Sequence, residues 1–300
     1  MAQYEFSLDD ASYMNAAIAH YVTTGSCVSR DGTRISYRQM GEGPGLVLVH
    51  GALQSSRSFT SLGAALCDTF TVYIPDRRGR GRSGPFGDSY AMQTEVEDLG
   101  ALLNKTGSHN VFGLSSGALI TLEAALTLPA IHKIALYEPA LEIDGQPSPL
   151  DWVPRYDKEL AAGNLPGAMV AIIKGTGDQS LFTSLPRFVL LPMFKLGMRY
   201  QSKRSEDDEP SLQALVPTVH FDTRLLMEMA GRLESFRTVR PEVLLLGGAR
   251  SVAFLTAALD ALSAILPNCK RIELPGLGHI AADNAGEPTR VADELRRYFS

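Results

Sequence analysis

The 300-residue chain has few cysteines and no excess of positive charge. Its three cysteines are unevenly spaced and odd in number, which fits neither a disulfide framework nor a paired zinc site, so we expect reduced thiols. The net charge is −5, from 28 Lys plus Arg against 33 Asp plus Glu. Such a chain has no field that would attract phosphate backbones or anionic lipid, which argues against nucleic acid as a partner.

Long apolar runs and clusters with metal-ligand spacing are also absent from the sequence. No run approaches the length of a membrane span, and the first ten residues, MAQYEFSLDD, lack the basic and apolar regions of a signal peptide. We therefore expect a cytoplasmic protein that uses no metal or other cofactor, has no membrane partner, and acts on a small molecule. Neither the oligomeric state nor a role for residues 1–24 follows from the sequence, although 8–21 could form a short helix.

Short apolar runs alternate with helix-length segments along most of the chain. A hairpin is predicted over 26–38 around the turn Asp31-Gly32. Strand and helix then alternate, which predicts a mostly parallel central sheet flanked by helices, with an antiparallel edge. The expected strands are 45–51, 70–76, 109–115, 132–139, 242–248 and 270–276, and the expected helices are 57–68, 94–106, 116–128, 252–266 and 287–299.

The alternation stops after Pro139 and resumes at Glu242. The intervening stretch is too long for a simple loop and contains helix-like pieces, among them an apolar, aromatic piece at 185–200 and a charged connector at 202–210. We predict an α/β core formed by 1–139 and 242–300, with a helical cap or lid inserted over 140–241.

The pentapeptide Gly113-Leu114-Ser115-Ser116-Gly117 has the pattern G-x-S-x-G. It lies where a predicted strand ends and a predicted helix begins. The glycines permit a tight turn that exposes the serine hydroxyl at the helix N-terminus, where negative charge is favoured. We predict that Ser115 is a nucleophile; the alternative is a serine- and glycine-rich helix start without a catalytic role.

A serine nucleophile needs a base, because it does not ionise usefully near pH 7. His279 follows the last predicted strand in LPGLGHIA, where two glycines allow a loop that brings its imidazole to Ser115. The remaining histidines are expected before the sheet (His20), at strand starts (His109, His132) and in the cap (His220). His50 is expected to have a structural role, orienting the loop in which it lies. His279 is therefore the predicted general base.

Acyl transfer also requires two fixed donors for the oxygen that becomes negatively charged. The predicted donors of this oxyanion hole are the N–H of Ser116 and that of Ala52, or alternatively Leu53, which follow the His50-Gly51 turn.

Together these motifs resemble the α/β-hydrolase superfamily, from about Gly25 to the C-terminus with the cap as the variable part. The resemblance rests on the H-G turn at 50–51, the strand-to-helix turn at Ser115, called the elbow, and G-x-G-H at His279. It also rests on DRRGRGRSG at 76–84, which is similar to the family's D-x-R-G-x-G-x-S loop. Taken alone, the four arginines within 77–82 would suggest an anion or RNA site. The resemblance implies instead a structural loop beside the active site.

The sequence departs from the family in its catalytic acid. The family usually places this acid just after the strand that follows the cap, where the chain reads GGARSVAF at 247–254 without a carboxylate. A minority carries it after the strand before the cap, and the resemblance then implies that Glu138 would hold the imidazole. Alternatively, Glu138 pairs with a cap arginine or reaches into the pocket, and the site is a Ser/His dyad. Weaker candidates for the acid are Asp144, Asp222 and Asp283.

The elbow serine predicts hydrolysis of a carboxylic ester, thioester or lactone of a small to medium apolar substrate through an acyl-enzyme. In similar proteins of this fold, epoxide and haloalkane hydrolysis use an aspartate at the elbow, so the serine found here argues against both reactions. Apolar cap residues suggest an apolar substrate, although the cap's own packing would explain most of them: Phe182, Phe188, Leu190, Leu191, Met193 and Phe194. Two alternatives stay open: C–C bond cleavage, lyase or cyclisation chemistry at the same serine and histidine, and a non-catalytic ligand binder.

Overall fold

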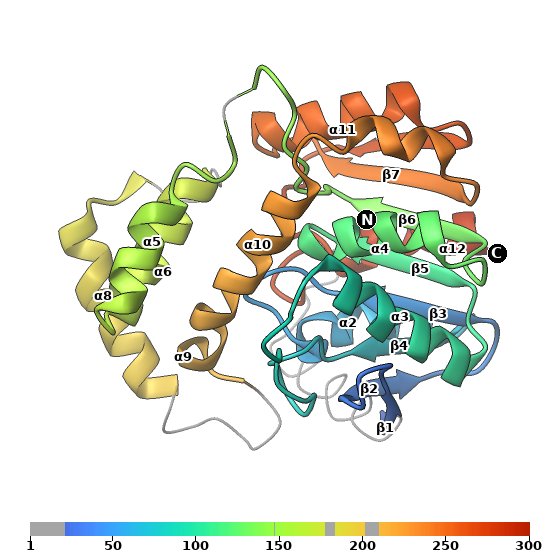
Figure 1. Cartoon of the computed structure of the whole chain (residues 1–300), viewed down its shortest axis with the longest axis horizontal. Coiled ribbons are helices and arrows are strands. Elements are labelled where there is room, and N and C mark those ends of the chain that lie inside the picture. Colours follow the sequence, from blue (N-terminus) through green and yellow to red (C-terminus); the bar gives the residue numbers. More distant parts are fainter. Residues whose placement is uncertain (1–21, 147, 178–183, 202–209) are drawn as a thin grey trace, which may run out of the picture.

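The computed structural model describes residues 22–146, 148–177, 184–201 and 210–300. Eight strands form one sheet of order β1-β2-β4-β3-β5-β6-β7-β8 (Figure 1). The strands are β1 Thr23–Val28, β2 Arg34–Met40, β3 Gly45–Val49, β4 Thr71–Pro75, β5 Asn110–Leu114, β6 Lys133–Tyr137, β7 Glu242–Gly248 and β8 Cys269–Leu274. Neighbours from β4 to β8 pair in parallel, and β2 is antiparallel to both β1 and β4. The predicted sheet with an antiparallel edge is confirmed.

The antiparallel edge is the predicted hairpin. β1 and β2 pair with Val28 opposite Arg34, and the Asp31 side chain accepts a hydrogen bond from the Thr33 N–H at 2.9 Å. This local bond within the connecting turn is the kind that aspartate makes readily.

Helices cover both faces of the sheet, which explains why its central strands are continuous apolar runs. One face packs against α3 (Met92–Thr106), α4 (Ser116–Thr127) and α11 (Ala253–Ile265). The other packs against α2 (Thr60–Leu66) and α12 (Pro288–Phe299). A short 3₁₀ helix, Ser56–Phe59, precedes α2. When these two are counted together as 56–66, each predicted helix of this core begins and ends within two residues of its expected bounds.

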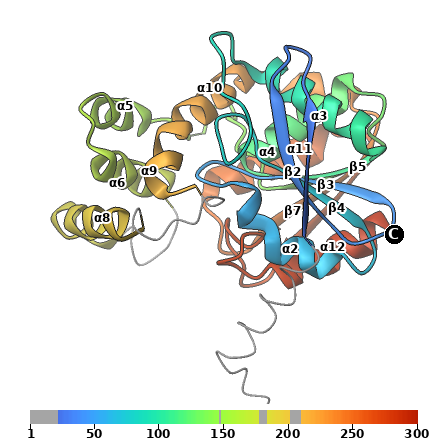
Figure 2. The ribbon, with the colours of Figure 1, turned by 90° about the horizontal axis from the view of Figure 1, so that it is seen from below.

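A helical segment is inserted between β6 and β7. It contains α5 Val153–Ala161, α6 Leu165–Thr176, α8 Arg187–Gln201, α9 Leu212–Leu215 and α10 Val219–Met229, with 3₁₀ turns at Val216–Thr218 and Leu233–Thr238. Figures 1 and 2 show α5, α6 and α8 standing to one side of the sheet, with α10 nearer to it. The outer helices have a small core of their own around Tyr156, Ile172 and Met198.

The apolar piece expected at 185–200 is α8, and its side chains divide between that core and solvent. Leu190 is buried and Phe194 packs against the small core, whereas Phe188 is 77% exposed. Phe182, the possible helix at 8–21 and residues 202–209 of the charged connector lie outside the described residues. In the part of the chain that the structure describes, no helix is both long and apolar enough to cross a membrane.

Candidate active site

Ser115 lies on a sharp turn between β5 and α4. Its backbone has φ 56° and ψ −118°, a strained conformation for a residue with a side chain. The flanking glycines are required by close backbone contacts: a Cβ on Gly117 would lie 2.3 Å from the Val49 carbonyl oxygen, and one on Gly113 would lie 2.5 Å from that of Gly117. The G-x-S-x-G pattern therefore reflects a turn that larger residues would break.

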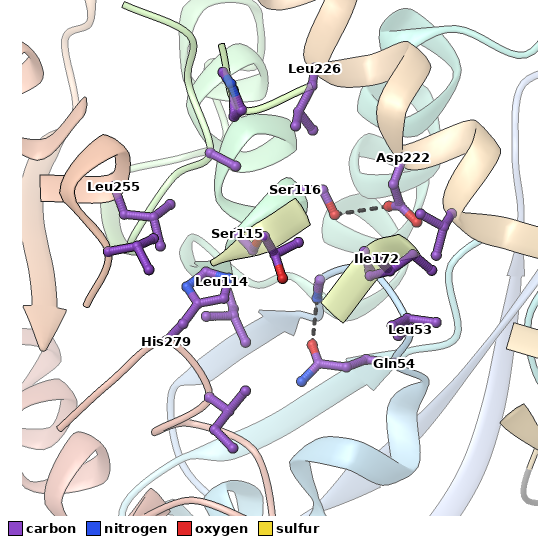
Figure 3. A pocket seen from close by; sticks show the side chains of 18 of the residues that line it. Leu53, Gln54, Leu114, Ser115, Ser116, Ile172, Asp222, Leu226, Leu255 and His279 are labelled. Atoms are coloured by element: carbon purple, nitrogen blue, oxygen red, sulfur yellow. Dashed lines mark hydrogen bonds between the residues drawn. The ribbon is translucent and has the colours of Figure 1, made fainter. Parts of the chain in front are cut away.

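His279 and Glu138 come together from loops that are distant in sequence. His279 follows β8, Glu138 follows β6, and the Nδ1 atom of His279 is 2.7 Å from Oε2 of Glu138. Glu138 is fully buried, while the side chain of His279 is 29% exposed and lines the same cavity as Ser115 (Figure 3). The structure thus brings Ser115, His279 and Glu138 to the carboxyl ends of β5, β8 and β6, where α/β folds bind ligands.

The second oxygen of Glu138 is held by the segment after β7. Oε1 accepts a hydrogen bond from the N–H of Gly248 at 2.6 Å and another from the hydroxyl of Ser251. Both donors belong to the stretch where the resemblance places the usual acid. Within the described residues Glu138 has His279 as its ion-pair partner and no arginine. Its carboxylate is therefore oriented, one oxygen toward the imidazole and the other toward two donors.

The other candidate carboxylates are placed differently. Asp222 is buried against Arg77 and Arg80, Asp283 accepts a hydrogen bond from Gln54 Nε2 at 2.7 Å, and Asp144 is exposed. Each has surroundings that do not involve the imidazole of His279.

The residues expected to supply the oxyanion donors line the same cavity as Ser115. Ser116 is the first residue of α4, so its N–H has no partner within the helix. Ala52 and Leu53 line the same cavity, and Leu53 has a positive φ of 58°. Gln54 fixes this turn: its Oε1 accepts from the Gly51 N–H at 2.8 Å while its Nε2 donates to Asp283.

Sequence reasoning missed Gln54. Its partner Asp283 is 229 positions away, and it lies just past His279 on the same loop. Gln54 therefore links the turn at 51–53 to the loop that carries His279, and no local pattern in the sequence indicates that contact.

His50 is fully buried beside the turn at 51–53. Its Nδ1 lies 3.0 Å from the carbonyl oxygen of Gly51, and its Nε2 accepts a hydrogen bond from the N–H of Arg77 at 3.3 Å. Burial, followed by the charges of Arg80 and Arg77, lowers the pKa of His50 well below its usual value. The ring is therefore neutral, with its proton on Nδ1 because a carbonyl can only accept and an N–H can only donate.

The remaining histidines are distributed as the sequence indicated. His109 and His132 stack with ring centroids 4.4 Å apart, at the opposite end of the sheet from Ser115, because they begin the strands whose far ends hold the site. His220 lies on α10, and its Nδ1 is 3.3 Å from Asp157. His20 is outside the described residues.

The arginine-rich loop after β4 is internal to the protein. Arg77, Arg78 and Arg80 are each no more than 2% exposed. Their acidic partners are Glu95 and Asp222 for Arg77, Asp31 and Asp98 for Arg78, and Asp222 for Arg80. These arginines pair with carboxylates, of which Glu95, Asp98 and Asp222 are buried and Asp31 is exposed, and do not present a surface for anions, in agreement with the structural loop that the resemblance implied.

A cavity of about 480 Å³ opens above the elbow (Figure 3). The core contributes Ser115, Ser116 and His279, and the inserted helices contribute mostly apolar side chains. Those from the inserted segment include Trp152, Met169, Ile172, Val219 and Leu226. The nucleophile candidate therefore lies at the floor of an apolar cavity formed between core and insertion.

Among the proteins similar to this chain in sequence are two that are named as hydrolases. The chain is 24% identical over 286 residues to the 3-hydroxybutyrate-oligomer hydrolase of Cupriavidus necator, covering 89% of this chain and 93% of that protein. It is 35% identical over 115 residues to the uncharacterized hydrolase YraK of Bacillus subtilis, covering 37% of this chain and only 42% of that protein, less than half of its length.

Solved structures with this fold include an alpha/beta hydrolase from Sphaerobacter thermophilus, with a TM-score of 0.74 and 29% identity over 92% of this chain and all of that one. The naproxen esterase of Bacillus subtilis matches with a TM-score of 0.63 and 21% identity over 99% of this chain and 100% of that one, which shows a shared fold. The family model described as the alpha/beta hydrolase family matches residues 46–294. The chain therefore belongs to the alpha/beta hydrolase family.

Proposed function

We propose that this hydrolase cleaves a carboxylic ester, or a related thioester or lactone, through an acyl-enzyme formed on Ser115. The observation that carries the proposal is the 2.7 Å contact between Nδ1 of His279 and the buried Glu138, at the cavity that also holds Ser115 on its strained turn. A nucleophile, a base and a group that orients the base are the parts that such chemistry needs.

In the first half-reaction, the Ser115 hydroxyl oxygen attacks the carbonyl carbon of the ester. Nε2 of His279 takes the hydroxyl proton, because Nδ1 is occupied by Glu138. The N–H groups of Ser116 and Ala52 stabilise the negative oxygen of the tetrahedral intermediate. The intermediate then collapses, the bond to the alcohol oxygen breaks, and His279 returns the proton to the departing alcohol.

The second half-reaction uses water in place of the alcohol. His279 takes a proton from water, whose oxygen attacks the acyl carbon, and then protonates Ser115 as the ester bond to the enzyme breaks. The products are a free carboxylic acid and the regenerated hydroxyl. Glu138 stabilises the imidazolium that forms twice in each cycle without itself taking the proton.

The inserted helical segment serves as the cap in this proposal and supplies much of the substrate site. Its apolar side chains and the cavity of about 480 Å³ suit a small to medium apolar group. The name of the Cupriavidus necator relative refers to 3-hydroxybutyrate oligomers, which are carboxylic esters, and this supports ester substrates as the first choice.

A p-nitrophenyl ester series from acetate to octanoate tests the proposal with the wild type, Ser115→Ala and His279→Ala. His109→Ala is the matched control, because His109 lies at the opposite end of the sheet. We expect both site variants to lose nearly all turnover and the control to keep it, and we expect a fluorophosphonate to label Ser115 alone. Ester turnover that survives Ser115→Ala would refute the proposal. A wild type that is inert to every ester and to the phosphonate would favour C–C bond chemistry or a ligand-binding role.

A further inference from the structure

A buried polar cluster connects the inserted segment to the turn that carries Ser115 and Ser116. It consists of Asp222 on α10, Ser116 at the start of α4, and Arg77 and Arg80 from the loop after β4; we call it the Asp222 cluster. All four side chains lie in the interior, with Asp222 only 2% exposed. Ser116 and Asp222 also line the cavity that holds Ser115, and the mechanism above uses only the backbone N–H of Ser116.

Asp222 makes three hydrogen bonds within the cluster. Its Oδ1 accepts from the Ser116 hydroxyl at 2.8 Å, as Figure 3 shows, and from Arg77 Nη1 at 2.9 Å. Its Oδ2 accepts from Arg80 Nη2 at 2.5 Å. Burial would raise the pKa of Asp222, but Arg80 and Arg77 outweigh burial and hold the pKa below its ordinary value. Asp222 is therefore a charged carboxylate at the centre of the cluster.

Arg77 connects the cluster to both sides of the proposed oxyanion hole. Its Nη1 donates to the Ser116 hydroxyl at 3.1 Å and to the carbonyl oxygen of His50 at 3.4 Å. Its backbone N–H donates to Nε2 of the same His50. Ser116 supplies one proposed oxyanion donor, and Ala52, two residues after His50, supplies the other. One guanidinium thus contacts the residues that position both donors.

The arginines depend on Asp222. Arg77 is shared with Glu95, which its Nη2 contacts at 2.9 Å, whereas Arg80 has Asp222 as its carboxylate partner within the described residues. The Nε and Nη1 atoms of Arg80 are buried there without a hydrogen-bond partner. A buried guanidinium with so few partners is costly without its carboxylate, so Asp222 fixes the position of both arginines.

The resemblance to the family does not account for this cluster. In the motif D-x-R-G-x-G-x-S, Asp76, Arg78 and Ser83 fall on fixed positions, whereas Arg77 and Arg80 fall on variable ones. Asp222 comes from the inserted segment, the variable part of the family. We propose that Asp222 is a positioning residue for the oxyanion hole, acting through Ser116 and Arg77. This inference rests on the proposed function.

A purely structural role for Asp222 would be to attach α10 to the core. The same helix offers a matched comparison, because Glu228 also lies on α10 and its Oε2 accepts a hydrogen bond from the Met92 N–H at the start of α3, at 2.8 Å. Glu228 attaches the helix to the core without touching the elbow. Loss of attachment alone should therefore affect Glu228 and Asp222 variants alike.

The experiment compares kcat and KM on the best p-nitrophenyl ester for Ser116→Ala, Asp222→Asn, their double variant and the control Glu228→Gln. Ser116→Ala keeps every charge and the oxyanion N–H, so it folds even if Asp222→Asn does not. We expect kcat to fall about 10-fold in Ser116→Ala and about 100-fold in Asp222→Asn, with KM within about twofold, because misplacement of the donors weakens only the transition state. The double variant should match Asp222→Asn, since the Ser116 hydroxyl acts through its bond to Asp222.

Affinity for an alkyl trifluoromethyl ketone gives an independent measurement, because its serine adduct carries an oxyanion. That affinity should fall in parallel with kcat/KM in the cluster variants and stay within about twofold of wild type in Glu228→Gln. Wild-type kcat in Ser116→Ala, or an equal loss in Glu228→Gln, would overturn the inference while leaving the ester hydrolase intact. A wild type without ester activity would refute the proposed function first, and the inference with it.

Discussion

Replacing Glu138 by glutamine tests the proposed displaced acid most sharply. The substitution keeps size and shape, so the positive φ of 47° and the burial of this position should be tolerated as they are for glutamate. Only one of the two terminal atoms can then remain an acceptor. The surroundings decide which one, because Gly248 N–H and the Ser251 hydroxyl both donate to the Oε1 position.

The amide oxygen of the introduced glutamine should occupy that Oε1 position, which turns its NH₂ group toward Nδ1 of His279. An N–H donor facing Nδ1 stabilises the imidazole tautomer that carries its proton on Nε2. That tautomer cannot accept the proton of Ser115. We therefore expect kcat of Glu138→Gln to fall by about 10³ to 10⁴, which corresponds to about 4 to 5.5 kcal/mol of activation free energy.

The tautomer argument also predicts an order among variants. Glu138→Ala removes the orienting carboxylate but leaves His279 free to adopt either tautomer, so it should retain at least as much activity as Glu138→Gln. The assay is kcat and kcat/KM on the best p-nitrophenyl ester from pH 5 to 9, with thermal unfolding to confirm that each variant folds. Retention of more than about a tenth of wild-type kcat by Glu138→Gln, with an unchanged pH profile, would show that Glu138 does not act on the imidazole.

Four further predictions test the surroundings of the site. In the Glu138→Ala background, Ser251→Asp places a carboxylate beside the vacated position and should restore at least about 10-fold of kcat, measured with the same ester. Gln54→Leu removes the contacts to Gly51 and Asp283, so kcat should fall about 10- to 100-fold with little change in KM. An unchanged kcat would show that the turn keeps its shape without these contacts. Ile172→Trp fills part of the cavity and should lower kcat/KM for octanoate at least about 10-fold while leaving acetate within about threefold; an unchanged chain-length profile would place the acyl group elsewhere. The pKa of His50 is depressed in the folded state, so the unfolded state binds its proton first as pH falls, and stability is lost below about pH 6.5. In urea unfolding, the difference in unfolding free energy between wild type and His50→Asn should shrink by about 1 kcal/mol between pH 6.5 and 5.5. A difference that stays constant over this range would contradict the prediction.

The parts of the fold that the sequence predicted are those encoded locally. Buried parallel strands are apolar runs bounded by turn residues, and the elbow at Ser115 requires glycines at fixed offsets because backbone atoms lie within 2.5 Å of where their side chains would begin. His279 could be predicted as the general base, among the histidines of the chain, because it follows the last strand. Each of these signals lies within a few residues of the feature that it predicts.

Contacts between distant segments left no such signal. Glu138 and Asp222 were both carboxylates with a possible link to the site, and only the three-dimensional arrangement separates the one beside His279 from the one beside two arginines. The apolar composition of α8 likewise did not show which of its side chains are exposed, since Leu190 is buried and Phe188 is 77% exposed. Composition indicates that a helix has an apolar side, and its packing partners decide which side chains are covered.

The position of Glu138 follows from the pairing of β6 with β7. These strands are parallel neighbours with Tyr137 opposite Leu246, so their carboxyl ends adjoin and either strand can deliver a carboxylate to the same place beside His279. The chain uses β6, and the segment after β7 then supplies the two donors, Gly248 and Ser251, that hold the displaced carboxylate. The backbone N–H of Glu138 also bonds to the Leu246 carbonyl at 3.0 Å, which continues the pairing of the strands into the site. What the proposed reaction constrains is the space next to Nδ1 of His279, and the acid in a related sequence should therefore be sought at the ends of both strands.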